Sequence, residues 1–249
     1  MNPLSGIGYF IKGLGLLMAP GVKRFVILPL LINCLLFSFA IWFGFGQISA
    51  WINALMTHLP DWLQWLSWVF YLLFGLVCLL IVFFSFSLLA NIVAAPFNDL
   101  LCAAITKHLA GPNAVAIDEQ TPFIQQILPA MGNEVRKLGY FVKWSIPFLV
   151  LLLIPGINII GTVLWFMYSA WMLNMEYLEY PLSQHNSDFK WQLQQLRNHK
   201  ILSLSYGSVV SAATLIPVFN FLVMPAAIAG ATAIWLDHYA ANVADRATS

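Results

Sequence analysis

Long apolar runs separated by short polar segments fill most of the chain. The first covers about residues 25–51 and the second about residues 62–95, and only the loop 52–61 separates them. Each run exceeds the roughly 20 residues that an α-helix needs to cross a bilayer. The short loop therefore predicts two long membrane helices that run antiparallel.

Two later segments share one plan and one motif. Ile-Pro-x-x-Asn stands at Ile154–Asn158 and again at Ile216–Asn220, each time between two apolar arms. The arms are either full crossings joined by a tight turn or half-crossings that return to the same side. Apolar stretches of about 10–14 residues favour re-entrant segments, but the longer second arms, 157–175 and 218–236, fit both alternatives. Broken helices at membrane depth occur only where protein or a water-filled path surrounds them.

Amphipathic segments flank these apolar runs. Residues 1–19 are expected to form an N-terminal amphipathic helix, and Asn98 is expected to cap a helix over 100–109, after Pro96 ends the second span. We expect a single membrane domain over 1–249. Its parts are the long hairpin with its amphipathic extension (22–110), the first broken hairpin unit (123–180) and the second broken hairpin unit (188–240).

Composition places the chain in a membrane. Hydrophobic residues make up 61% of it and charged residues only 8%, whereas soluble domains carry about 25% charged residues. All eleven lysines and arginines lie outside the 52–61 loop and outside both Ile-Pro-x-x-Asn turns. The positive-inside rule then puts both termini in the cytoplasm of a multi-pass inner-membrane protein.

The sequence carries no enzyme signature. It lacks a nucleophile elbow, a His-Glu-x-x-His pair and a phosphate loop. Its three cysteines are too few and too scattered for a zinc site or a disulfide framework. The net charge of +1 gives no reason to expect nucleic acid as a partner. We therefore expect no catalysis, no metal and no cofactor.

The segment Gly21-Val22-Lys23-Arg24 is the first candidate binding site. A helix start offers unpaired N–H groups and the positive end of the helix dipole to an anion, and two cations add charge. Basic residues also collect there because a cytoplasmic flank attracts them, so both interpretations stay open.

Four residues of the two motifs form the second candidate set. They either line a polar path or only shape the turns: Pro155, Asn158, Pro217 and Asn220. Charged residues nearby either form buried ion pairs or lie on a solvated surface: Glu134, Arg136, Lys137, Glu176 and Glu179. The N-terminal glycines are expected to allow close helix packing: Gly6, Gly8, Gly13 and Gly15.

Three segments together resemble the CysZ sulfate permease family of bacteria, and the resemblance covers almost the whole chain. They are residues 20–25 (Pro-Gly-Val-Lys-Arg-Phe), 94–99 (Ala-Ala-Pro-Phe-Asn-Asp) and 215–232, which begins Leu-Ile-Pro-Val-Phe-Asn. The resemblance implies sulfate uptake for cysteine biosynthesis. It implies an all-α membrane protein with two long transmembrane helices, two pairs of half-penetrating hairpins and amphipathic cytoplasmic helices.

The resemblance also implies a sulfate site and an assembly. Sulfate would bind at Gly21–Arg24, where Lys23 stands in place of a typical arginine, so that the charge is kept and the guanidinium fork is lost. Homo-oligomers, as antiparallel dimers or larger assemblies in membrane lipid, are implied as well. That arrangement conflicts with the one-sided distribution of the basic residues.

Two functions are compatible with the sequence. The first is a sulfate permease that does not hydrolyse ATP itself, working as a channel or with a coupling ion. The second is a non-transporting scaffold or regulator of other transporters, which the lack of strongly charged residues within the spans favours. Sulfate bound at Lys23 and Arg24 would distinguish the permease from the scaffold.

Overall fold

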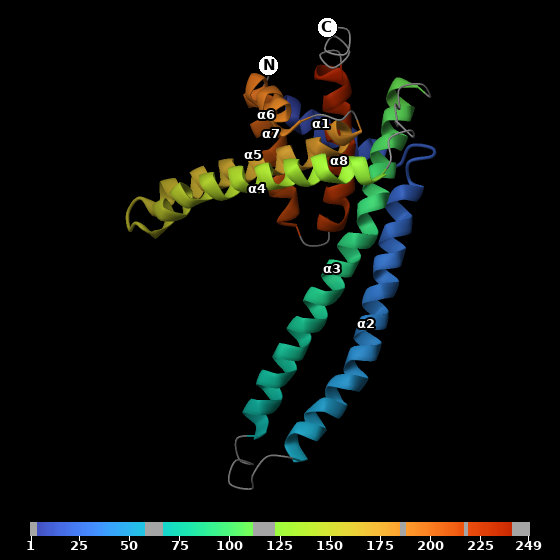
Figure 1. The fold of residues 1–249 in the computed structure, drawn as a ribbon, viewed down its shortest axis with the longest axis vertical. Helices are drawn as coiled ribbons and strands as arrows, with labels where there is room; N and C mark the ends of the chain where they lie inside the picture. Colours follow the sequence, from blue (N-terminus) through green and yellow to red (C-terminus); the bar gives the residue numbers. More distant parts are fainter. Residues whose placement is uncertain (1–3, 58–66, 112–122, 185–187, 217–218, 241–249) are drawn as a thin grey trace. The chain divides into compact units, whose positions relative to one another are not determined.

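The computed structural model describes residues 4–57, 67–111, 123–184, 188–216 and 219–240, with only the backbone at some positions of α2, α3 and α4. Every regular element in these ranges is an α-helix, as predicted (Figure 1). The helices are α1 (Ser5–Leu16), α2 (Arg24–Thr57), α3 (Ser67–Ala110), α4 (Phe123–Leu153), α5 (Asn158–Ser183), α6 (Phe189–Asn198), α7 (Lys200–Thr214) and α8 (Asn220–His238). The chain divides into two compact units, which are treated separately: residues 24–97, and residues 1–23 with 98–249.

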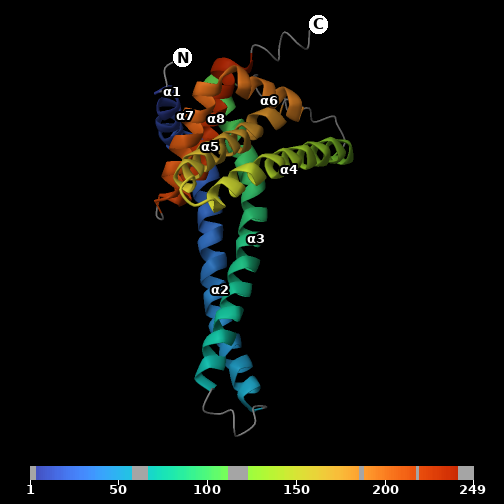
Figure 2. The same cartoon turned by 90° about the vertical axis from the view of Figure 1, so that its left-hand side faces the viewer.

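The unit over residues 24–97 is a long helical hairpin. It consists of α2 and the first part of α3, which run antiparallel in both views (Figures 1 and 2). Large apolar side chains such as Leu35, Trp42 and Leu72 are exposed along it. Contiguous exposed apolar surface of this kind is rare on soluble monomers and is expected where a helix faces lipid.

Two described helical segments are long and apolar enough to cross a membrane: Arg24–Phe43 and Asn220–His238. The first overlaps the predicted span 25–51 and begins one residue before it. Much of the second predicted span, 62–95, lies where side chains are not described. The second segment is α8, the longer arm of the second broken hairpin, so its length alone permits a full crossing.

The predicted break after the second span is wrong. Helix α3 passes through Pro96 without interruption and ends only at Ala110, so Asn98 lies inside the helix and does not cap one. A proline inside a helix costs about 3 kcal/mol because it removes one backbone hydrogen bond. That cost is offset here because the following turns pack tightly, with Leu101, Cys102 and Ile105 fully buried.

The helices of the first broken hairpin are also longer than expected. Helix α4 joins the predicted amphipathic segment 123–143 and the apolar arm 144–154 into one helix. Helix α5 continues beyond Met175 and through Pro181 to Ser183, so that Glu176 and Glu179 lie on the helix. The change from apolar to polar sequence marks where the surroundings of a helix change, and it does not mark where the helix ends.

Helix α8 forms the centre of the larger unit. Its residues Ala226–Trp235 are buried. Helix α1 packs on α8 and α7, while α5 packs on α7, α4 and α8 (Figure 2). The Tyr206 hydroxyl of α7 donates a hydrogen bond to the Ala227 carbonyl of α8. Cys102 Sγ of α3 lies 3.3 Å from Thr232 Oγ1, which attaches the end of α3 to the same core.

Close packing explains two of the four N-terminal glycines. A Cβ on Gly13 would lie 2.3 Å from the Ala226 carbonyl oxygen, and one on Gly6 would lie 2.3 Å from the Tyr206 nitrogen. The prediction is confirmed for these two. It is wrong for Gly8 and Gly15, where an added Cβ would meet no atom within 4 Å. The reason is helical geometry, because the two pairs point to different sides of α1.

Candidate functional site

The first candidate site lies where α2 begins. Gly21 has a φ of +83°, a left-handed conformation that favours glycine. The turn is closed by hydrogen bonds from the N–H groups of Val22 and Lys23 to the Ala19 carbonyl, at 3.1 and 3.5 Å. Val22 is buried, whereas Lys23 and Arg24 are exposed. The turn therefore buries the Val22 side chain and leaves both cations exposed.

The two cations at this helix start, Lys23 and Arg24, form no ion pair with any described acidic residue. The Arg24 guanidinium carbon lies 4.7 Å from the centroid of the Phe25 ring, a cation–π arrangement that leaves its N–H groups available. Chemically, the segment offers two positive charges at the positive end of a helix dipole, which suits a small oxyanion.

The asparagines of the two Ile-Pro-x-x-Asn motifs make equivalent backbone hydrogen bonds. The Asn158 N–H donates to the Ile154 carbonyl at 3.1 Å, and the Asn220 N–H donates to the Ile216 carbonyl at 2.9 Å. Each asparagine is the first residue of its helix, α5 or α8, and each is exposed. These hydrogen bonds involve backbone atoms alone, so the structural role weighed for the two asparagines stays a prediction. Whether they line a path also stays a prediction.

Of the two motif prolines, the structure describes Pro155 but not Pro217. Pro155 is exposed and precedes Gly156, whose φ of +88° makes the sharp reversal between α4 and α5. Pro217, with Val218, lies outside the described residues.

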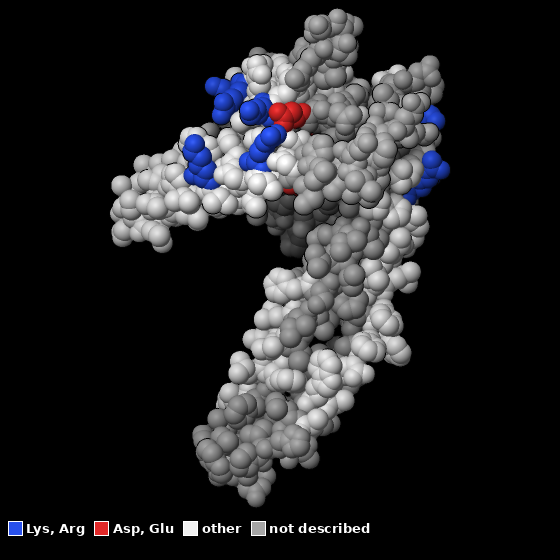
Figure 3. Space-filling view, in the orientation of Figure 1, with Lys and Arg blue, Asp and Glu red and all other residues white. Residues whose placement is uncertain are grey.

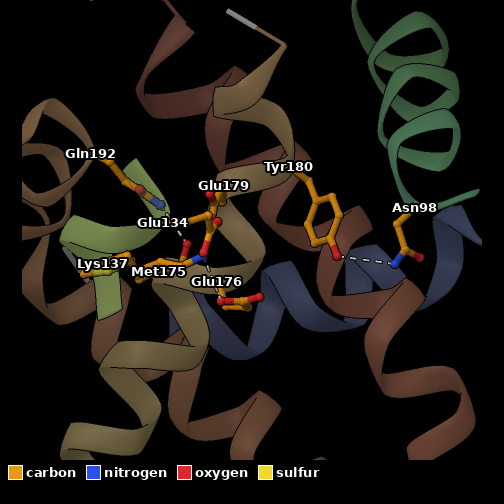
Figure 4. Close-up of polar contacts among 8 residues, drawn as sticks. All are labelled: Asn98, Glu134, Lys137, Met175, Glu176, Glu179, Tyr180 and Gln192. Carbon is orange, nitrogen blue, oxygen red and sulfur yellow. Dashed lines mark hydrogen bonds and ion pairs between the residues drawn. The ribbon is translucent and has the colours of Figure 1, made fainter. Parts of the chain in front are cut away.

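A lysine-centred ion cluster joins α4 to α5. The Lys137 ammonium nitrogen lies 2.9 Å from Glu134 Oε1 and 3.3 Å from Glu176 Oε2, and it also contacts Glu179 (Figure 4). Only 13% of the Lys137 side chain is exposed. These four residues therefore form ion pairs, but the cluster is buried only in part, because Glu134 and Glu176 are half exposed. Arg136, by contrast, pairs with Asp188 on the surface, at 3.1 Å.

The cluster lines a cavity of about 250 Å³. The lining includes a third helix, because Asp99 comes from the end of α3, and Asn98 beside it donates a hydrogen bond to the Tyr180 hydroxyl at 3.3 Å (Figure 4). Sequence reasoning missed Asp99, Tyr180 and Ser183 as lining residues. The spacing Glu134-x-x-Lys137 does indicate one pair of the cluster in advance, because residues three apart share one face of a helix.

The charge of this cavity excludes it as the first contact for an oxyanion. Its lining has one ammonium and four carboxylates: Asp99, Glu134, Glu176 and Glu179. A dianion there would meet like charge at short range, which disfavours binding. Neither of the exposed cations Lys23 and Arg24 lines this acidic cavity.

The surroundings of the cluster shift the protonation of its members. Burial raises the pKa of Glu179 to about 7, although its hydrogen bond to Lys137 acts in the opposite direction. Burial lowers the pKa of Lys137, but its bonds to Glu179 and Glu134 outweigh this, and the net pKa is raised. Lys137 therefore stays charged at neutral pH, while Glu179 is partly protonated.

The chain is similar to known proteins over nearly its whole length. Residues 9–225 match the family model described as sulfate transporter CysZ/etoposide-induced protein 2.4. A protein of Salmonella typhimurium is 43% identical over 242 residues, which cover 96% of this chain and 95% of the relative. A protein of Pectobacterium atrosepticum is 42% identical over 241 residues, covering 94% and 86%. A protein of Pseudomonas aeruginosa is 39% identical over 236 residues, covering 95% and 96%. Each of the three is called sulfate transporter CysZ.

Proposed function

The chain belongs to the sulfate transporter CysZ/etoposide-induced protein 2.4 family, and from this premise we propose that it is a sulfate permease of the bacterial inner membrane. Its role is to bring sulfate into the cytoplasm for cysteine biosynthesis, without hydrolysing ATP itself. The observation that carries the proposal is the identity of 39–43% over nearly the full length with bacterial proteins called sulfate transporters.

The proposed first contact for sulfate is the start of α2. Lys23 and Arg24 are exposed, and no carboxylate among the described residues pairs with them. Gly21 and Val22 shape the turn that presents them. Charge-assisted hydrogen bonds to an oxyanion are about twice as strong as neutral ones, so two cations at a helix start can select a dianion.

The proposed membrane arrangement follows the family. The chain forms a single multi-pass membrane domain, in which α2 and α3 cross as a long hairpin. The pairs α4–α5 and α7–α8 enter the bilayer halfway and return at Pro155–Asn158 and Pro217–Asn220. The short α7, 15 residues long, supports this arrangement, since it spans only about 22 Å at 1.5 Å per residue. Assembly into homo-oligomers, as antiparallel dimers or larger, is part of the same proposal.

Flux of labelled sulfate into proteoliposomes tests the proposal. We expect uptake above that of empty vesicles when the purified chain is the only protein present. A double variant, Lys23→Ala with Arg24→Ala, should lose most of this flux if the α2 start is the entrance. Absence of flux from the wild-type protein, with sulfate binding retained, would instead favour a non-transporting scaffold or regulator.

A further inference from the structure

A groove with two chemically different ends lies between α4 and α5. Its volume is about 480 Å³, within the range of small-molecule sites. Apolar side chains line most of it: Leu138 and Phe141 of α4, and Trp165, Met172 and Leu173 of α5. Ser169 and three ionisable side chains of the lysine-centred cluster line the rest, and the three are Glu134, Lys137 and Glu176.

The two ends are separated by the antiparallel register of α4 and α5. Lys137 pairs with Glu176 at the end remote from the turn. One turn along α4, the Phe141 carbonyl accepts a hydrogen bond from the Tyr168 hydroxyl at 2.7 Å. From there to the turn at 154–157 the exposed side chains are mainly apolar, with Leu153 and Ile159 among the most exposed. The groove therefore runs from a charged end to an apolar end along the helix axes.

The charged end has an excess of negative charge. Glu134 and Glu176 are the accessible members of the cluster, with 56% and 55% of their side chains exposed. Behind them lies the cavity that Asp99 and Glu179 also line. One lysine balances only one of these four carboxylates. A cationic group in contact with Glu134 and Glu176 is attracted, whereas an anionic group in the same place is repelled.

We propose that this groove binds a phospholipid whose headgroup ends in a primary ammonium, as in phosphatidylethanolamine. One acyl chain lies along the apolar lining beside Trp165, and the ammonium group donates hydrogen bonds to Glu134 and Glu176. A primary ammonium has three N–H donors, whereas the quaternary choline headgroup has none. The polarity of the groove matches that of a lipid, with its charge at the bilayer surface and its chain in hydrocarbon. This inference rests on the membrane arrangement proposed for α4 and α5 and not on sulfate transport.

Tryptophan quenching by brominated lipid tests the proposal on the intact protein. The contribution of Trp165 is the difference between the fluorescence of the wild type and that of Trp165→Phe. It is measured in phosphatidylcholine vesicles that contain a minor share of brominated phosphatidylethanolamine or the same share of brominated phosphatidylcholine. We expect quenching of Trp165 to show at least about a threefold preference for the phosphatidylethanolamine, because only its headgroup makes charge-assisted hydrogen bonds. Equal quenching by the two lipids, or stronger quenching by brominated phosphatidylglycerol, would overturn the proposal.

Charge-neutral variants identify the headgroup site. The double variant Glu134→Gln with Glu176→Gln keeps the side-chain shape, and it should abolish the preference while leaving general quenching by the acyl chains. The matched control is Asp237→Asn, which removes another exposed carboxylate, 3.1 Å from Lys12 and outside the groove. It should keep the preference. A preference that survives the double variant would contradict the assignment.

A soluble amine separates a lipid site from a site for free amines. Ethanolamine added at millimolar concentration should leave the quenching of Trp165 by brominated phosphatidylethanolamine unchanged, because the acyl chain supplies much of the binding free energy. Displacement of the lipid by ethanolamine at such concentrations would show that the groove recognises the amine alone and would contradict the lipid proposal.

Discussion

The Lys137 ammonium lies 3.3 Å from the Glu176 carboxylate and thereby links α4 to α5. The same nitrogen also binds Glu134 and Glu179, so one lysine holds three carboxylates from two helices. In the view of Figure 3, several lysines and arginines lie at the surface around α4 and α6. Lys137 differs from an exposed cation in being largely buried among acids.

Removing the Lys137 ammonium should destabilise the larger unit. We expect Lys137→Met to lower the free energy of unfolding by about 1–3 kcal/mol, because three carboxylates then face one another without a cation. The range is below that of fully buried pairs because Glu134 and Glu176 are half exposed. Denaturation in detergent micelles, followed by circular dichroism, measures the change. The control is Arg136→Met, which breaks an exposed pair with Asp188 and should cost less than about 1 kcal/mol.

Deprotonation of Glu179 should make stability fall as pH rises toward neutrality. Its pKa in the folded protein is raised to about 7, above an unfolded value of about 4.3. Between these values the folded state binds more protons than the unfolded state, so the contribution of Glu179 is greatest below pH 4 and is lost as pH rises through about 7. The difference between the wild type and Glu179→Gln, measured as unfolding free energy at pH 5, 6, 7 and 8, isolates this group. A constant difference across this range would contradict the assignment.

Sulfate affinity should depend on the side chains at the start of α2. Arg24→Ala should raise the sulfate Kd about tenfold or more, because it removes a charge-assisted hydrogen-bond donor. Lys23→Arg should lower the Kd, since it adds a second guanidinium fork. Isothermal titration calorimetry measures both. Lys200→Ala is the matched control, because Lys200 is also an exposed cation at a helix start, that of α7, and its loss should leave the Kd unchanged. Unchanged affinity in Arg24→Ala would move the site elsewhere.

Two glycines of α1 should respond oppositely to alanine. Gly13→Ala places a methyl group 2.3 Å from the Ala226 carbonyl oxygen and should destabilise the protein by about 1–3 kcal/mol. Gly15→Ala meets no atom within 4 Å and should stabilise it by up to about 1 kcal/mol, the difference in helix propensity. Thermal unfolding in detergent compares them directly. Equal effects of the two substitutions would show that α1 does not pack on α8 in this register.

The half-crossing arrangement can be tested by labelling the turns. A cysteine at Asn158 or Asn220 should resist a membrane-impermeant maleimide from the periplasmic side of intact cells, because a half-crossing leaves the turn inside the bilayer. A cysteine in place of Asp61, in the loop predicted to face the periplasm, should react readily. Rapid labelling at position 158 or 220 from the periplasmic side would establish full crossings.

The sequence by itself determined the membrane class, the helical fold and the two related turns. These follow from local physics: apolar runs of sufficient length form helices in lipid, and a glycine such as Gly156, which adopts a positive φ, lets the chain reverse. It also placed Lys23 and Arg24 at a helix start, because a helix start is a local property of the chain.

Only the tertiary structure decided which interruptions end a helix and which charges meet. Pro96 does not end α3, because Cys102 and its neighbours bury their side chains in the turns that follow. The free energy gained by this burial outweighs the loss of one backbone hydrogen bond. Lys137 meets Glu176 and Glu179 across some forty residues of chain because the turn at 154–157 sets the register of α4 against α5. Such pairings depend on distances between segments far apart in the sequence, and no local pattern of residues specifies those distances.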